Sequence, residues 1–216
     1  CIRDSSYAIY NIGGTIDTIT NSGVGASITS GAGAINNSGT IVNIENSNSA
    51  LISGGTNAIL NSATGRINSI SNSGSITATQ SSVFNSSGIS NGGEINSIAN
   101  SGNISAYQGT YTDKHAGIQN LGTGSIYTLQ NSGSISATYA IDNRKQNGMS
   151  GYIGTINNTG FGAALIGSSH AVNNDGVIDN VNNANSALIY GTSIGIQNTN
   201  QIGQITNSAS MGGGAG

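Results

Sequence analysis

The sequence predicts an all-β fold, a right-handed parallel β-helix (β-solenoid) of about eight coils, each with about 24 residues and three short strands. Three observations predict it: an apolar-x-Asn tripeptide recurs along nearly the whole chain, Gly, Asn and Ser separate the extended pieces, and the 216 residues include no proline and only 6% charged residues. Short β-branched pieces bounded by turn residues favour strands over helices. Because hairpin signals are lacking, we expect each unit to wind onward with the right-handed crossover that parallel strands prefer.

The first apolar-x-Asn tripeptide of each unit predicts a strand that ends in an asparagine at a turn. Subtracting the asparagine numbers gives steps of mostly 23 to 26 residues, with two longer ones. Asparagine tolerates left-handed backbone and bonds to nearby main chain, and stacked asparagines can form amide ladders. The predicted turn asparagines of this set are Asn11, Asn37, Asn61, Asn85, Asn120, Asn143, Asn174 and Asn198.

A second tripeptide in each unit predicts a second strand, and a third apolar site after the next turn predicts a third. Equivalent isoleucines of successive coils would then stack about 4.8 Å apart, and burial of each is worth roughly 1.5–3 kcal/mol. The second set of turn asparagines is Asn21, Asn46, Asn72, Asn100, Asn131, Asn158, Asn183 and Asn207. The third apolar sites are Ile52, Ile76, Ile104, Ile135, Ile166 and Ile189.

The repeat pattern also predicts how the chain is divided. Two units are longer than the rest, and insertions in solenoids form loops on one side that often serve binding. We expect the last unit to be truncated. The predicted segments are a lead-in over 1–7, a solenoid over 8–208 with loop insertions near 87–92, 107–115 and 144–152, and a glycine-rich tail over 209–216.

The insertions gather three of the five basic residues of the chain together with several tyrosines. This concentration predicts a patch that faces a ligand or partner. The alternative is that these are tolerated surface loops with no partner. The candidate binding residues are Tyr107, Tyr111, Lys114, His115, Arg144, Lys145 and Tyr152.

Composition argues against several other functions. Five Lys and Arg residues cannot track a phosphate backbone, so we expect no nucleic-acid partner. No apolar run approaches the roughly 20 residues of a membrane helix, so we expect no membrane insertion by this segment. The lone Cys1 excludes an internal disulfide. Cys1 and the two separated histidines, His115 and His170, do not have the spacing of zinc ligands. We therefore expect neither a metal nor a cofactor.

Catalysis is also not expected. Glycoside hydrolysis needs two carboxylates within about 5–10 Å of each other. Mapped onto the coils, no two acidic residues repeat a site on adjacent coils, and Asp175 and Asp179 share a coil but are separated by a turn or bend. We therefore predict a protein that is not an enzyme, with no catalytic residues.

The recurring NSGTI, NSGSI and NSGNI segments, as at residues 37–41, 72–76 and 100–104, give the chain a family resemblance. In an Ile/Asn/Ser-rich solenoid they resemble the passenger region of bacterial autotransporters, the type V secreted surface proteins, over residues 8–208. The resemblance implies display on the bacterial cell surface or release outside the cell. It also implies a non-catalytic stalk acting in adhesion or self-association, whose partner is a host or bacterial surface receptor, a carbohydrate, or copies of itself.

Two other functions remain open from the sequence. An open β-coil exposes unpaired edge groups that invite stacking, so the chain could be a filament subunit that stacks end to end. Because many parallel β-helices cleave polysaccharides, a polysaccharide-degrading enzyme is the second alternative.

Overall fold

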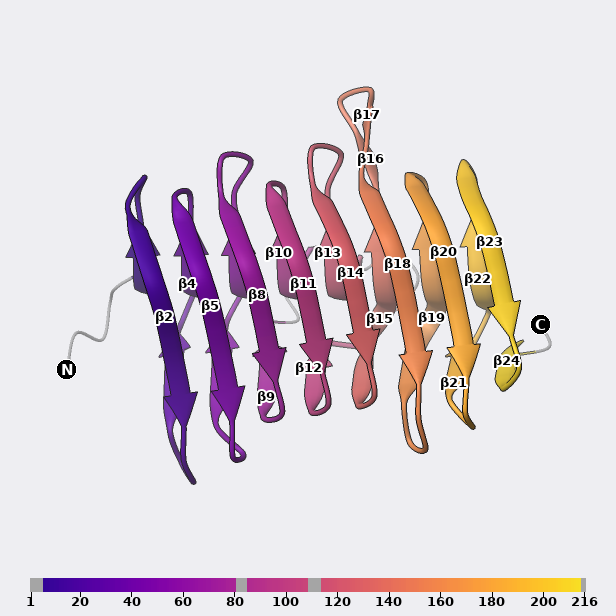
Figure 1. Cartoon of the computed structure of the whole chain (residues 1–216), viewed down its shortest axis with the longest axis horizontal. Helices are drawn as coiled ribbons and strands as arrows, with labels where there is room; N and C mark the ends of the chain where they lie inside the picture. Colours follow the sequence, from indigo (N-terminus) through magenta and orange to yellow (C-terminus); the bar gives the residue numbers. More distant parts are fainter. Residues whose placement is uncertain (1–5, 81–84, 109–113, 215–216) are drawn as a thin grey trace.

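The chain folds as a right-handed parallel β-solenoid. The computed structural model describes residues 6–80, 85–108 and 114–214. An 8-stranded sheet faces a 14-stranded sheet, and each coil adds one strand to the first of them. In Figure 1 the chain descends through the 8-stranded sheet in front, rises through the other sheet behind and advances toward the C-terminus, which is a right-handed winding. The predicted fold class is therefore confirmed.

The 8-stranded sheet contains the second strand of every coil. All its neighbours pair in parallel, in the order β2-β5-β8-β11-β14-β18-β20-β23. These strands are β2 (Thr15–Ser22), β5 (Thr40–Ser47), β8 (Arg66–Asn72), β11 (Glu94–Asn100), β14 (Ser125–Asn131), β18 (Tyr152–Thr159), β20 (Val177–Ala184) and β23 (Gln201–Asn207).

The 14-stranded sheet contains both the third strand of each coil and the first strand of the next. In two places these are a single continuous strand, β15 (Ser134–Asn143) and β19 (Ala164–Asn174). The other first strands are β1 (Tyr7–Asn11), β4 (Gly33–Asn37), β7 (Asn57–Asn61), β10 (Ser87–Asn91), β13 (Ala116–Asn120) and β22 (Ile194–Asn198). The other third strands are β3 (Ser27–Ser30), β6 (Leu51–Gly54), β9 (Ser75–Ala78), β12 (Asn103–Ser105), β21 (Leu188–Gly191) and β24 (Ser210–Gly213).

The core between the sheets is built from columns of stacked aliphatic residues. In the 8-stranded sheet, Ile70, Ile98 and Leu129 are direct register partners, and all three are buried. The third strands supply a parallel column, in which Leu165 rather than the predicted Ile166 aligns with Ile135. Burial of such side chains contributes roughly 1.5–3 kcal/mol each, which no single coil could obtain alone.

Two ladders of asparagine side chains run the length of the rod beside the core. In each, the Nδ2 of one asparagine donates to the Oδ1 of its equivalent in the next coil at 2.7–2.9 Å. The same Nδ2 atoms also donate to turn carbonyls, as Asn37 does to Gly39 at 3.0 Å. Fifteen of the sixteen predicted turn asparagines belong to the ladders, and that part of the prediction is confirmed.

The exception is Asn85, which is exposed and lies outside the ladder. Asn91 takes its place, accepting from Asn61 and donating to Asn120. Residues 87–92 were expected to form a loop, but they contain β10, which pairs in register with β7 and β13. The extra residues of this coil therefore precede its first strand.

Three further boundaries differ from the prediction. Tyr7, which the prediction placed in the lead-in, belongs to β1 and pairs with Gly33 of β4. The last unit is not truncated, because β24 within the expected tail pairs in parallel with β21. The insertion near 144–152 is present as an antiparallel hairpin of β16 (Lys145–Gln146) and β17 (Met149–Ser150), and it projects from the rod in Figure 1.

None of the residues that the structure describes belongs to a helix long and apolar enough to cross a membrane.

Candidate functional site

The structure assembles part of the predicted patch beside the β16–β17 hairpin. Lys114, Arg144 and Lys145 line a groove of about 400 Å³, which we name the hairpin groove. The sequence prediction did not include the other lining residues, which are Leu121, Tyr139, Asp142, Gln146, Asn173, Asp175 and Gln197.

The floor of the hairpin groove consists of the outward positions of successive first strands. In each apolar-x-Asn tripeptide the apolar residue and the asparagine point inward, which leaves x outward. Asp142, Asn173 and Gln197 hold this position in three adjacent coils and are register partners. The Asn173 Nδ2 donates to the Asp142 Oδ1 at 2.9 Å, so the floor is polar and internally bonded.

Arg144 fixes the wall of the groove. Its Nε donates to the Asp142 Oδ2, its Nη1 to the Asn85 Oδ1 at 3.1 Å and its Nη2 to the Lys114 carbonyl at 3.3 Å. The Asp142 side chain is only 1% exposed, and a carboxylate buried to this degree requires a charged, hydrogen-bonded partner. The guanidinium therefore holds together segments from several coils, and most of its donors are already engaged.

The two lysines of the groove are differently placed. Lys114 and Lys145 are both exposed. Among the described residues the ion pairs are Arg66 with Glu94 and Arg144 with Asp142, so within that part of the chain neither lysine is paired with a carboxylate. Both lysines are among the residues that line the groove.

Two carboxylates line this groove from adjacent coils, although they occupy different sites of the repeat. Asp142 lies in the first strand of one coil, and Asp175 follows the first strand of the next. Both oxygens of Asp142 accept hydrogen bonds, from Arg144 and Asn173. Asp175 accepts from the Thr199 hydroxyl at 2.6 Å. Each of the two carboxylates thus accepts at least one hydrogen bond from a protein side chain.

Tyr107 and His115 pack together and are not among the residues that line the groove. Their rings meet edge to face with centroids 5.5 Å apart. His115 is fully buried, and its Nδ1 lies 2.6 Å from the Ser86 hydroxyl. The His115 imidazole thus joins its own segment to the one before β10, while Tyr107 remains 46% exposed.

Tyr152 belongs to the opposite sheet. It begins β18, and its hydroxyl donates to the Asp179 Oδ2 at 2.6 Å. That hydrogen bond, with burial and the negative charge of Asp179, raises the pKa of the Tyr152 phenol above its ordinary 10.0. Tyr152 is therefore not part of the hairpin groove. Tyr111 lies outside the described residues.

Two further findings concern metal ligands and similarity to known proteins. Among the residues that the structure describes, no three His, Cys, Asp or Glu side chains gather as a metal centre. No family model, curated protein or solved structure matches the chain.

Proposed function

We propose that this chain is a non-catalytic rod, displayed on a bacterial cell surface or released outside the cell, that attaches to a partner surface through an acidic glycan. The observation that carries the proposal is the hairpin groove, where Lys114 and Lys145, which form no ion pair within the described residues, stand at the rim of a floor of Asp142, Asn173 and Gln197. With Arg144 the groove has three cations against the two carboxylates of Asp142 and Asp175, so its net charge is positive. Ammonium groups attract carboxylate or sulfate, and amide side chains offer both donors and acceptors to sugar hydroxyls.

The rod supports this role mechanically. Stacked coils and the Arg144 contacts fix the groove before any ligand arrives, and a preformed site loses less conformational entropy on binding. The location outside the cell rests on the resemblance of the NSG-type repeats to autotransporter passengers. Protease treatment of intact cells that express the protein tests it: cleavage of the rod is expected, and full protection would contradict surface display.

Binding to immobilised polygalacturonate and heparin, with dextran as the neutral comparison, tests the ligand. A Lys114→Gln/Lys145→Gln double variant should bind the acidic polymers at least about tenfold more weakly, and wild-type binding should weaken with added salt. The matched control is Arg66→Gln, which removes an exposed cation on the other sheet.

Equal binding by the double variant would refute the hairpin groove as the site. Release of shortened oligosaccharides from either polymer during the assay would replace adhesion with the polysaccharide-degrading alternative.

A further inference from the structure

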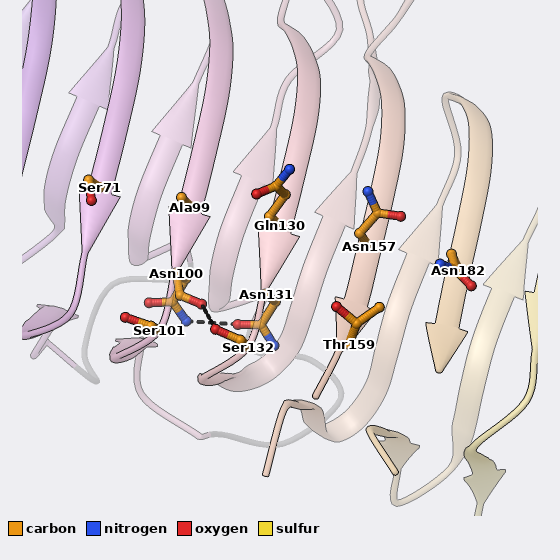
Figure 2. Close-up of a pocket in the computed structure, with 10 residues that line it drawn as sticks. All are labelled: Ser71, Ala99, Asn100, Ser101, Gln130, Asn131, Ser132, Asn157, Thr159 and Asn182. Carbon is orange, nitrogen blue, oxygen red and sulfur yellow. Dashed lines mark hydrogen bonds between the residues drawn. The ribbon is translucent and has the colours of Figure 1, made fainter. Parts of the chain in front are cut away.

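A second groove crosses the outer face of the 8-stranded sheet (Figure 2). It has a volume of about 400 Å³ and extends over five successive coils, from Ser71 in β8 to Asn182 in β20. We name it the amide groove, after the side chains of Gln130, Asn157 and Asn182 that stand in a row along it.

The sequence explains why a groove forms here. Its floor is the outward position of the second apolar-x-Asn tripeptide, where Ala99 and Ser71 are small and the next three coils have amides. The second strands β11 and β14 are followed by tight Ser-Gly turns, at Ser101-Gly102 and Ser132-Gly133. The turn after Thr159 in β18 is longer and projects further at the bottom of Figure 1. The groove is thus open over the small residues and flanked by the longer turn.

The chemistry of the groove is entirely neutral. None of its ten lining residues carries an ionisable side chain. The side-chain amides of Gln130, Asn157 and Asn182 make no hydrogen bond within the described residues, and each offers an acceptor and two donors. Ser101 and Ser132 form its edge and bond to carbonyls of the preceding coil at 3.4 Å. Free neutral amides in a row match a ligand rich in hydroxyl groups and without charge.

An exposed aromatic residue follows closely after one of the lining residues in the sequence. Phe161 is 95% exposed at the tip of the turn Gly160–Gly162, two residues beyond the lining residue Thr159. Two Cα–Cα steps limit its Cα to within about 7.6 Å of that of Thr159. Both flanking glycines have positive φ, 115° and 87°, a conformation that glycine adopts without steric cost. A phenylalanine this exposed contributes nothing to the core, and its ring is accessible to a ligand.

We propose that the amide groove binds an extended neutral polysaccharide lying along the rod, with Phe161 stacking against the apolar face of one sugar ring. Successive coils repeat about every 4.8 Å, which is close to the advance per ring of an extended pyranose chain. Each amide can therefore meet the hydroxyl groups of a successive sugar. This site does not depend on the hairpin groove or on its ligand.

Native electrophoresis in gels cast with hydroxyethylcellulose, glucomannan, laminarin or pullulan tests the proposal with the whole chain. At least one of these neutral polymers should retard the protein, and the retardation should persist at high salt. Phe161→Ala and Asn157→Leu should each weaken the affinity about tenfold, with circular dichroism showing that both variants remain folded.

Two variants provide matched controls. Val24→Ala changes the 97%-exposed residue of the equivalent Gly-Val-Gly turn in the first coil, and Gln204→Leu changes an outward amide of β23 beyond the groove; both should bind as the wild type does. The proposal is overturned if no polymer retards the chain or if Phe161→Ala binds normally. It is also overturned if retardation disappears in Lys145→Gln, which would move the ligand to the hairpin groove.

Discussion

At the scale of a single residue, each ladder asparagine satisfies several groups that the coil leaves buried. The Nδ2 of Asn61 donates hydrogen bonds to the Oδ1 of Asn91 at 2.8 Å and to the carbonyls of Gly65 and Glu94 at 3.2 and 3.1 Å. Its own Oδ1 accepts from Asn37 at 2.9 Å. A turn carbonyl or amide left unpaired in this environment costs about 1–3 kcal/mol, so one side chain removes several such penalties.

Replacing a mid-rod ladder asparagine should be costly. Asn61→Ala leaves buried carbonyls and the Asn37 and Asn91 amides short of partners, so we expect a loss of about 2–4 kcal/mol in the free energy of unfolding. Urea denaturation followed by circular dichroism measures it. Asn96→Ala, which breaks an amide pair with Asn68 on the exposed face, should cost less than about 0.5 kcal/mol. Equal losses would contradict the structural role of the ladder.

His170 should make stability fall in acid. Burial lowers the pKa of its imidazole below the ordinary 6.5, an effect that the nearby Asp142 charge partly opposes. Because the unfolded chain then binds the proton more tightly, the stabilising contribution is complete above pH 6.5 and is lost as pH falls through the folded-state pKa. The urea midpoint of unfolding, measured from above pH 6.5 down to below the folded-state pKa, should decline less in His170→Gln than in the wild type. If the two proteins gave the same dependence of the urea midpoint on pH, His170 would not be a cause of the acid sensitivity.

The one wrong ladder residue shows what a tripeptide motif can and cannot determine. Val83-Phe84-Asn85 and Ile89-Ser90-Asn91 both fit apolar-x-Asn, so the motif alone cannot choose between them. The residue before the apolar one can: in the first strands it is Ala or Gly, as with Gly88. A Cβ at Gly88 would lie 2.8 Å from the Gly117 carbonyl and 3.0 Å from the Ile104 side chain, so this coil requires glycine, while other coils accommodate a buried alanine at the same position.

At the scale of elements, sequence predicts the strands better than the surfaces between them. Strand positions follow from local alternation and turn residues, and they were largely recovered. The hairpin groove depends on which outward residues become neighbours across a coil, as Asp142 and Asn173 do at a separation of 31 residues. Two insertions of uncertain length precede that contact. The groove-lining residues were therefore missed although Lys114, Arg144 and Lys145 were identified.

The β16–β17 hairpin should be removable without loss of the fold. Deleting residues 145–150 joins Arg144 to Gly151 and gives Asn-Arg-Gly, the spacing of Asn174-Asp175-Gly176 in the next coil, where the Asn174 amide bonds to the Gly176 carbonyl at 3.2 Å. We expect a melting temperature within a few degrees of the wild type, because the deletion leaves the ladder and core intact. Differential scanning calorimetry checks this.

The same deletion removes Lys145 and one wall of the hairpin groove. Binding to polygalacturonate should therefore fall while the thermal transition stays in place. A large drop in melting temperature would show that the hairpin supports the stack, and undiminished binding would place the acidic glycan elsewhere.

At the scale of the whole molecule, the rod is a one-dimensional stack in which each coil contacts its neighbours. Every strand pair in the two large sheets joins elements of adjacent coils, as β8 with β11 and β11 with β14. Mutational effects should therefore couple between neighbouring coils and become additive with distance along the rod.

Double-mutant cycles test how far along the rod the coupling between mutations extends. Ile70→Val and Ile98→Val alter direct register partners, and each should cost about 0.5–1.5 kcal/mol. Their combination should depart from additivity by more than about 0.5 kcal/mol. Ile156, three coils from Ile70, is about 14 Å away, so the pair Ile70→Val/Ile156→Val should be additive. Comparable coupling in both pairs would indicate that packing strain spreads through the whole core.

The uniform direction of the asparagine ladders also gives the rod an electrical polarity. In both ladders every Nδ2–H points toward the following coil, and an amide carries a dipole of about 3.5 D. These dipoles add along the axis, with their positive ends toward the C-terminal coil. Two such rods lying side by side would attract each other when antiparallel and repel when parallel, and a dilute suspension would align in an applied electric field.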